Sequence, residues 1–257
     1  MPTVCEASCV KLSPVRMPRF FAVGTVLALA SAGALALPGT SGASGISAAK
    51  LYREAIATTK SWSVHYASAG TDMGVTILES GDAGPASGVQ QVLVGKGTAQ
   101  DSATLIVIGG ITYMKGNARA LVDLTGLSAA QAQANAGKWV QFATDNKAFA
   151  QVVAGVRSHD VTQELELKGP YTLGTPRRLD DTLVIPIRGM QHFQGLKTMR
   201  AILYVREKGT HVPVEEDTVN AQGQSNGMEH TMYSKWSERV RPTAPTASVT
   251  IGPVDVT

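Results

Sequence analysis

The sequence predicts an α+β domain in which one antiparallel sheet wraps helices on one of its faces. Three observations lead to this prediction. Segments with alternating apolar and polar residues, typical of strands, occur in both halves of the chain, and a helical segment separates them. Short turns rich in Gly and Asp join the strands, as in an antiparallel meander. No internal repeat is found along the chain.

The composition is that of a globular chain. Of the 257 residues, 44% are apolar, 17% are charged and 26 are glycines. These values exclude a disordered chain, a collagen-like chain and a polytopic membrane protein. The length suffices for a single domain with a sizeable core once a targeting segment is removed.

The N-terminus has the pattern of a secretory signal peptide. Three basic residues between positions 11 and 19 precede an apolar run at residues 20–37, and Met17 is a candidate start closer to that run. We expect cleavage near Ala36, with Ala43 as a later alternative. An uncleaved membrane anchor is the competing interpretation, because the run is almost long enough to span a bilayer. The expected location is therefore the periplasm or cell envelope, or the outside of the cell.

This pattern divides the chain into four predicted parts. They are a signal peptide at 1–36, a linker at 37–45, a folded domain at 46–240 and an extended tail at 241–257.

Cleavage would remove Cys5 and Cys9, the two cysteines of the chain. The mature domain would then have no disulfide, thiol nucleophile or cysteine metal ligand. Neither cysteine follows the apolar run, so no lipid anchor is expected. Without residues 1–36 the formal net charge falls from +3 to +1, which removes the main support for nucleic-acid binding.

The periodicity of the chain places each element. A helix is expected to start at a Ser47 cap and to reach about Lys60, and a second one to run from an Asp145 cap to Val156. An edge strand is expected at 249–251 within the proline-rich tail. The remaining strands are expected around 62–66, 75–77, 89–94, 104–108, 111–115, 138–142, 171–175, 183–188, 198–206, 211–218 and 228–236.

Residues 223–227, Gly-Gln-Ser-Asn-Gly, match the G-x-S-x-G pattern of a serine hydrolase, with Ser225 as nucleophile. That pattern needs a helix after it, whereas residues 228–236 alternate like a strand. Asn226-Gly227 is also a preferred pair for a hairpin turn, so we interpret the pentapeptide as a turn. A serine hydrolase that uses Ser225 remains a remote alternative.

Other candidate sites have no compact pattern. The five histidines lack the spacing of a metal site, and no glycine pattern predicts nucleotide binding. The acidic clusters at 180–181 and 215–217 lie beside turn or edge-strand signals, where solvated charge prevents strand pairing. We therefore expect no metal, cofactor or catalytic residue.

Several short phrases of the chain resemble the LolA-like superfamily, in particular the actinobacterial LppX/LprG type of cell-envelope lipid-binding protein. The resemblance covers most of the mature chain and depends on the order of the phrases. They are Ile-Thr-Tyr-Met-Lys-Gly-Asn at 111–117, Gly-Lys-Trp-Val at 137–140, Leu-Tyr-Val at 203–205, His-Val-Pro at 211–213 and Tyr-Ser-Lys-Trp-Ser-Glu at 233–238.

The resemblance implies a strongly curved antiparallel sheet, a half-open barrel, with helices in its concavity and a cavity for acyl chains. It implies a non-enzymatic carrier or sensor of lipid or lipoglycan acyl chains, and an envelope transport protein is the expected protein partner. Members of this type carry a cysteine after the signal peptide that receives a lipid, and this chain has none. An interaction module with the same fold and a filled interior is the alternative.

Alternation along the strands predicts which side chains face such a cavity. Each contributes an apolar surface on which a lipid methylene group gains about 0.8 kcal/mol by burial. The expected lining residues are Val64, Tyr66, Val75, Ile77, Val92, Val94, Phe149, Val153, Leu183, Ile185 and Met232.

Overall fold

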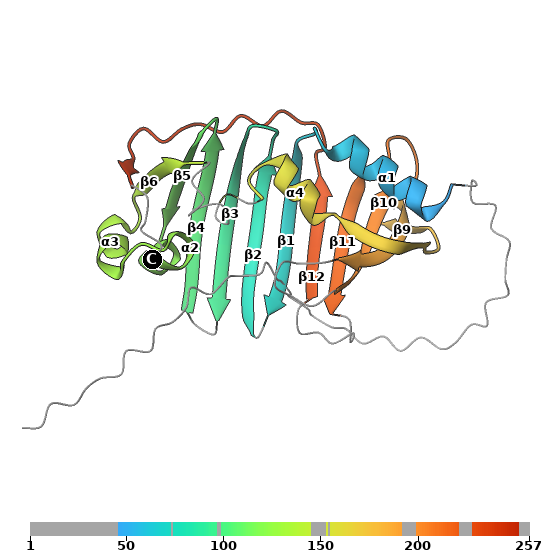
Figure 1. Ribbon diagram of the computed structural model, residues 1–257, viewed down its shortest axis with the longest axis horizontal. Coiled ribbons are helices and arrows are strands. Elements are labelled where there is room, and N and C mark those ends of the chain that lie inside the picture. Colours follow the sequence, from blue (N-terminus) through green and yellow to red (C-terminus); the bar gives the residue numbers. More distant parts are fainter. Residues whose placement is uncertain are drawn as a thin grey trace, which may run out of the picture.

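The computed structural model describes residues 46–72, 74–96, 99–144, 153, 155–191, 199–220 and 228–251. One large sheet dominates these residues, and helices cover one of its faces (Figure 1). The predicted α+β class and the strongly curved, unclosed sheet are confirmed.

The sheet follows chain order in two blocks. The strands of its first half are β1 (Val64–Asp72), β2 (Val75–Ala83), β3 (Ser87–Lys96), β4 (Ala99–Ile108), β5 (Ile111–Gly116) and β6 (Trp139–Ala143). Those of its second half are β7 (Leu167–Leu173), β8 (Arg177–Leu179), β9 (Thr182–Gln191), β10 (Met199–Arg206), β11 (Pro213–Asn220) and β12 (Met228–Ser234). The last strand, β13 (Val249–Thr250), joins the first half at its edge.

The spatial order is β13-β6-β5-β4-β3-β2-β1-β12-β11-β10-β9-β7, with β8 paired to β9. The pairing of β1 with β12 joins the two halves and is antiparallel. Between the named strands, only the pairing of β13 with β6 is parallel. The segment after β12 runs along one end of the strands to reach β13 at the far edge, so the predicted edge strand in the tail is present (Figure 1).

Four helices occur in the described residues: α1 (Ala48–Thr59), α2 (Ala118–Thr125), α3 (Ala129–Asn135) and α4 (Ser158–Glu164). The predicted cap of α1 is confirmed, because the Ser47 hydroxyl accepts the Lys50 N–H. Asn117 caps α2 in the same way, and Gly126 ends that helix with a φ of 71°.

The second predicted helix is only partly testable. Residues 145–152 and 154 lie outside the described residues, and residues 155–156 form a turn and a bend. The helix of this region, α4, begins at Ser158 instead. Its backbone is fixed to the sheet, since the Ser158 N–H donates to the Gly84 carbonyl at 3.0 Å.

We define the inner face as the face that α1 and α4 cover and the outer face as its opposite (Figure 1). The inner face carries two apolar clusters. The first lies under α2 and includes Leu105, Met114 and Leu121. The second lies under α1 and includes Leu51 and Leu203. Fully burying one such side chain contributes about 1.5–3 kcal/mol, so both clusters hold the helices on the sheet.

Candidate functional site

The inner face carries most of the predicted lining residues. Residues paired across antiparallel strands point to the same face. Ile77 pairs with Val94, and both belong to the first apolar cluster, against which Val75 packs. Val64 and Tyr66 belong to the second cluster. The remaining members on this face are Val92 and Val153 in the first cluster and Ile185 in the second.

Three predicted lining residues differ from these. Met232 faces outward and is 51% exposed, because its neighbours Thr231 and Tyr233 occupy the inward positions of β12. The prediction that placed Met232 inward was wrong by one residue of register, which turns every side chain of a strand to the other face. Leu183 is only partly buried and lies outside both clusters. Phe149 lies outside the described residues.

Helix α2 covers the first apolar cluster through a short interface. Its buried residues are Ala120, Leu121 and Thr125. One salt bridge ties it to the sheet, since Arg119 Nε lies 2.5 Å from Asp101 Oδ1 on β4. A hollow of about 10 Å³ remains between α2 and strands β3 and β4, and Val92 and Val94 are part of its wall. That volume holds one water molecule at most, so the helix is seated closely on the sheet.

A group of polar side chains lies on the inner face near the junction of the two halves. We call Ser68, Glu216, Thr218, Glu229 and Thr231 the acid–hydroxyl cluster. The Ser68 and Thr231 hydroxyls are 2.7 Å apart, and Ser68 also donates to Glu229. Glu216 is 4% exposed and Thr218 is 2% exposed, so this polar group is largely buried.

Burial raises the pKa values of two side chains in this region. The pKa of Glu216 is raised well above its ordinary value, first by loss of solvent and then by the nearby Glu229 carboxylate. The Tyr233 hydroxyl donates to Glu216 Oε2 at 3.2 Å, and burial also raises the pKa of Tyr233. Burial therefore disfavours the charged form of Glu216.

Sequence reasoning missed this cluster. It placed residues 215–217 at a solvated edge, whereas β11 lies inside the sheet between β10 and β12. Three consecutive acidic residues in a strand must turn at least one side chain to each face, and that alternation was the available signal.

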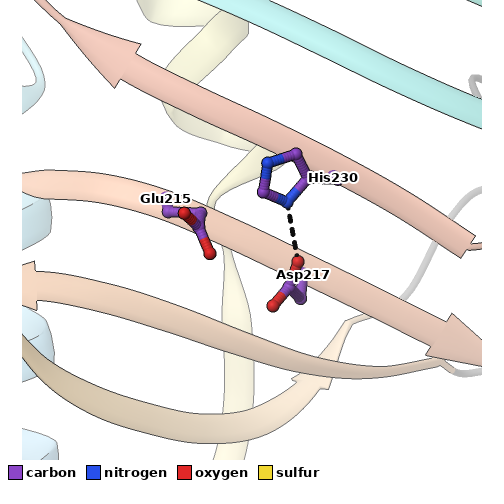
Figure 2. A group of neighbouring side chains, drawn as sticks. All are labelled: Glu215, Asp217 and His230. Atoms are coloured by element: carbon purple, nitrogen blue, oxygen red, sulfur yellow. Dashed lines mark hydrogen bonds and ion pairs between the residues drawn. The ribbon is translucent and has the colours of Figure 1, made fainter. Parts of the chain in front are cut away.

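The outer face carries the other two acids of this run. Glu215, Asp217 and His230 come together from β11 and β12, with ligand atoms all within 4.8 Å of one another (Figure 2). His230 Nδ1 lies 2.8 Å from Asp217 Oδ1, and this hydrogen bond is the main cause that raises the pKa of His230. Burial raises the pKa of Glu215.

The same carboxylates already have protein partners. Tyr204 donates to Asp217 Oδ2 at 3.1 Å, and Arg177 lies 4.0 Å from Glu215. The Arg177 guanidinium also covers the Tyr204 ring at 4.2 Å. On the outer face these acidic side chains are therefore paired with basic and hydroxyl groups of neighbouring strands.

A second hollow, of about 250 Å³, lies between β1, β2 and the segment 235–242. His65 Nδ1 lies 2.8 Å from Asp82 Oδ1 in its wall. Lys235, Arg239 and Arg241 also contribute to this wall, which makes the hollow polar.

The predicted turn at 223–227 lies outside the described residues, including Ser225. The strands on either side of it, β11 and β12, pair with each other in antiparallel fashion. A strand, not a helix, follows the pentapeptide, so the context that a nucleophilic serine needs is absent from the described residues around it.

No helix in the described part of the chain has both the length and the apolar character needed to cross a bilayer.

No protein-family model matches the chain, and no curated protein matches it in sequence. Several solved structures match it in fold. LprF from Mycobacterium bovis is 12% identical, with a TM-score of 0.50 over 78% of this chain and 97% of LprF. A conserved protein from Thermus thermophilus has a TM-score of 0.40 and 11% identity, over 79% of this chain and 98% of its own.

A LolA superfamily protein from Nitrosomonas europaea has a TM-score of 0.29 and 11% identity, over 77% of this chain and 96% of its own. The likeness to LprF spans nearly all of that protein. At this TM-score the chain shares the fold of LprF, so the strongly curved half-barrel that the sequence resemblance implied is confirmed.

Proposed function

We propose that this chain, which has the LolA-like fold, is an exported carrier or sensor that binds lipid acyl chains on the inner face of its sheet, without catalysis. The observation that carries the proposal is the position of α2. This short helix covers the first apolar cluster with few buried residues and one salt bridge. We call the part of the inner face beneath α2, which includes Val92 and Val94, the acyl floor. An acyl chain would replace α2 on this floor and bury the same apolar surface.

The likeness to LprF and the resemblance of the sequence phrases to lipid-binding envelope proteins support the same proposal. Export is supported by the pattern of residues 1–36. The described lining residues on the inner face are proposed as the acyl-binding surface. They are Val64, Tyr66, Val75, Ile77, Val92, Val94, Val153 and Ile185.

Two neighbouring residues of β3 provide a matched test. Val92 is buried in the first cluster, and Leu93, the next residue, is 36% exposed on the outer face. We expect Val92→Asn to weaken uptake of a fluorescent fatty acid by the delipidated protein, because a polar group would then line the acyl floor. Leu93→Asn should leave uptake unchanged. Thermal unfolding of both variants checks that each is folded at the assay temperature.

Native mass spectrometry of the protein, purified from its own host without detergent, tests the proposal directly. A stoichiometric acylated species would support it. A protein that carries no lipid from the host and takes up no acyl chain in vitro would overturn it.

An interaction module with a filled interior is the second candidate. The observation in its favour is the small hollow under α2, about 10 Å³, which leaves no preformed cavity at that position. If this candidate is correct, Val92→Asn and Leu93→Asn will bind fluorescent fatty acid equally poorly, as will the unaltered protein.

A further inference from the structure

The acid–hydroxyl cluster lies in register with the proposed acyl floor. Glu216 pairs with Thr231, and Thr231 pairs with Ser68. Val64 pairs with Ala83 and Asp72 with Val75, so the register of β1 and β2 places Ser68 opposite Glu79. Glu79 pairs with Val92 in turn. One row of inward residues therefore runs across the strands from the cluster to the floor under α2.

This row changes from polar to apolar along its length. Neighbouring strands lie about 4.8 Å apart, so Ser68 and Val92 are separated by about 10 Å. Beyond Val92 the row continues to Ala103, in the first apolar cluster. An amphiphile lying across the strands would meet hydrogen-bonding groups at one end and apolar side chains at the other.

Two buried oxygens of the cluster have no hydrogen-bond partner in the structure: Glu216 Oε1 and Thr218 Oγ1. A buried polar atom without a partner is costly, and such atoms are rare in folded proteins. Oε2 of Glu216 accepts the Tyr233 hydroxyl, and Oε1 is left for another hydrogen bond. Oε1 can accept a hydrogen bond from a ligand hydroxyl group, and the Thr218 hydroxyl can donate to such a group or accept from it.

The charge around these oxygens selects the ligand. The inward residues that the structure describes on β1, β2, β11 and β12 include Glu79, Glu216 and Glu229 and no lysine or arginine. A phosphate would be repelled by the Glu229 carboxylate and would find no cation to pair with. A hydroxyl group meets no such penalty. Glu229 is partly exposed, so the cluster reaches the surface on its side.

We propose that the acid–hydroxyl cluster binds the uncharged, hydroxyl-bearing head group of a lipid, a glycerol or a sugar, and disfavours anionic phosphate head groups. This inference rests on the proposed function, because it assigns the head-group end of the same ligand. It is independent of the outer-face network around His230.

A competition experiment tests it with three lipids that share the same acyl chains. The delipidated full chain is mixed with equal amounts of dioleoylglycerol, monogalactosyl dioleoylglycerol and dioleoyl phosphatidic acid, and the bound species are counted by native mass spectrometry. We expect the neutral lipids to exceed phosphatidic acid about tenfold, the effect of one or two hydrogen bonds. The ratio between the two neutral lipids shows whether the glycerol or the sugar hydroxyl is preferred.

Variants of the cluster show whether it causes the preference. Glu216→Leu should bring the ratio of neutral to anionic lipid close to one while total binding persists, and Thr218→Val should lower it. Glu216→Gln should keep the preference, because its side-chain amide can also form hydrogen bonds with a ligand hydroxyl group. Asp217→Asn, the outer-face neighbour, is the matched control and should match the unaltered protein.

The outcomes separate this inference from the proposed function. Equal binding of all three lipids by the unaltered protein, or a full preference retained in Thr218→Val and Glu216→Leu, overturns the head-group assignment and leaves lipid binding intact. Binding of none of the lipids overturns the proposed function and this inference with it. If Glu216→Leu does not fold, Thr218→Val and Asp217→Asn decide the question.

Discussion

Arg119 of α2 and Asp101 of β4 form a salt bridge of 2.5 Å that fastens the helix over the first apolar cluster. The bond raises the pKa of Arg119, and Asp101 is largely buried while Arg119 is half exposed. The other contacts of helix α2 include three buried side chains, Ala120, Leu121 and Thr125, and its Asn117 cap. Loss of this salt bridge should therefore lower the free energy needed to separate α2 from the sheet.

We predict that Asp101→Asn accelerates uptake of a fluorescent fatty acid several-fold, because α2 loses its ionic contact with the sheet. Stopped-flow fluorescence measures the uptake, and hydrogen exchange should be faster at the amides of α2. Asp181→Asn is the control, since Asp181 forms an exposed pair with Arg178 between β8 and β9. Unchanged uptake together with faster exchange in α2 would show that the helix opens without admitting lipid.

The His230–Asp217 pair predicts a pH dependence of stability. The folded-state pKa of His230 is raised above 6.5, so its stabilising contribution is complete below the unfolded value and is lost as pH rises through the folded value. The raised pKa of Glu215 acts in the same direction, because its charged form is disfavoured in the folded state. We expect His230→Gln to lower the melting temperature at pH 5.5 and to have little effect at pH 8.5.

The effect should be modest, about 1–2 °C, because solvent screens this partly exposed pair. Arg177 and Tyr204 also face these carboxylates, and burial raises the pKa of Tyr204 to about 12. His211→Gln is a suitable control, because His211 Nδ1 lies 2.9 Å from the Arg206 backbone carbonyl oxygen, which is not an acidic group. An equal loss at both pH values for His230→Gln would contradict the prediction.

The inward and outward faces of β12 can be distinguished by chemical labelling. In a background with Cys5 and Cys9 replaced by Ser, we predict rapid reaction of a maleimide with Met232→Cys and slow reaction with Thr231→Cys. Met232 is 51% exposed, whereas Thr231 is buried in the acid–hydroxyl cluster. Mass spectrometry follows both reactions. Faster labelling at position 231 would mean that the register of β12 is the one predicted from the sequence.

Much of the fold was predictable because the signals for its helices and strands involve only residues close together in the sequence. Ser47 caps α1 as expected, and the strands lie close to their predicted positions, since capping and alternation are local signals. Alternation identifies two faces but not which of them is covered. Met232 was therefore placed on the wrong face, whereas Val64 and Ile185 are buried in the second apolar cluster of the inner face.

The polar site was less predictable, because it brings β1 together with β11 and β12, which lie far from β1 in the sequence. Ser68 and Thr231 are hydrogen-bonded across 163 positions, and no local pattern indicates that contact. Glu216 is buried only because β10 and β12 enclose β11. Charge composition suggested solvation for this run, and tertiary structure overrode it.

Gly88 and Gly95 of β3 provide a final prediction about how the chain segment before α4 is seated on the sheet. A Cβ added at Gly88 would lie 1.9 Å from the Val156 carbonyl oxygen, a backbone atom that cannot move without shifting the segment. A Cβ added at Gly95 would meet nothing closer than 3.7 Å. Both glycines lie in the same strand with φ outside the left-handed region, so alanine restricts the unfolded chain equally at the two positions.

The difference between the two alanine variants therefore isolates the steric conflict. We expect Gly88→Ala to be less stable than Gly95→Ala by about 1–3 kcal/mol, the usual cost of overpacking. Urea unfolding of the two variants measures this difference. Equal stabilities would mean that the segment at 155–157 does not rest on Gly88, and its parallel bridge from Arg157 to Gly84 would then be lost as well. Because that bridge leads directly into α4, a real difference would identify Gly88 as the point where the sheet fixes the helix over its inner face.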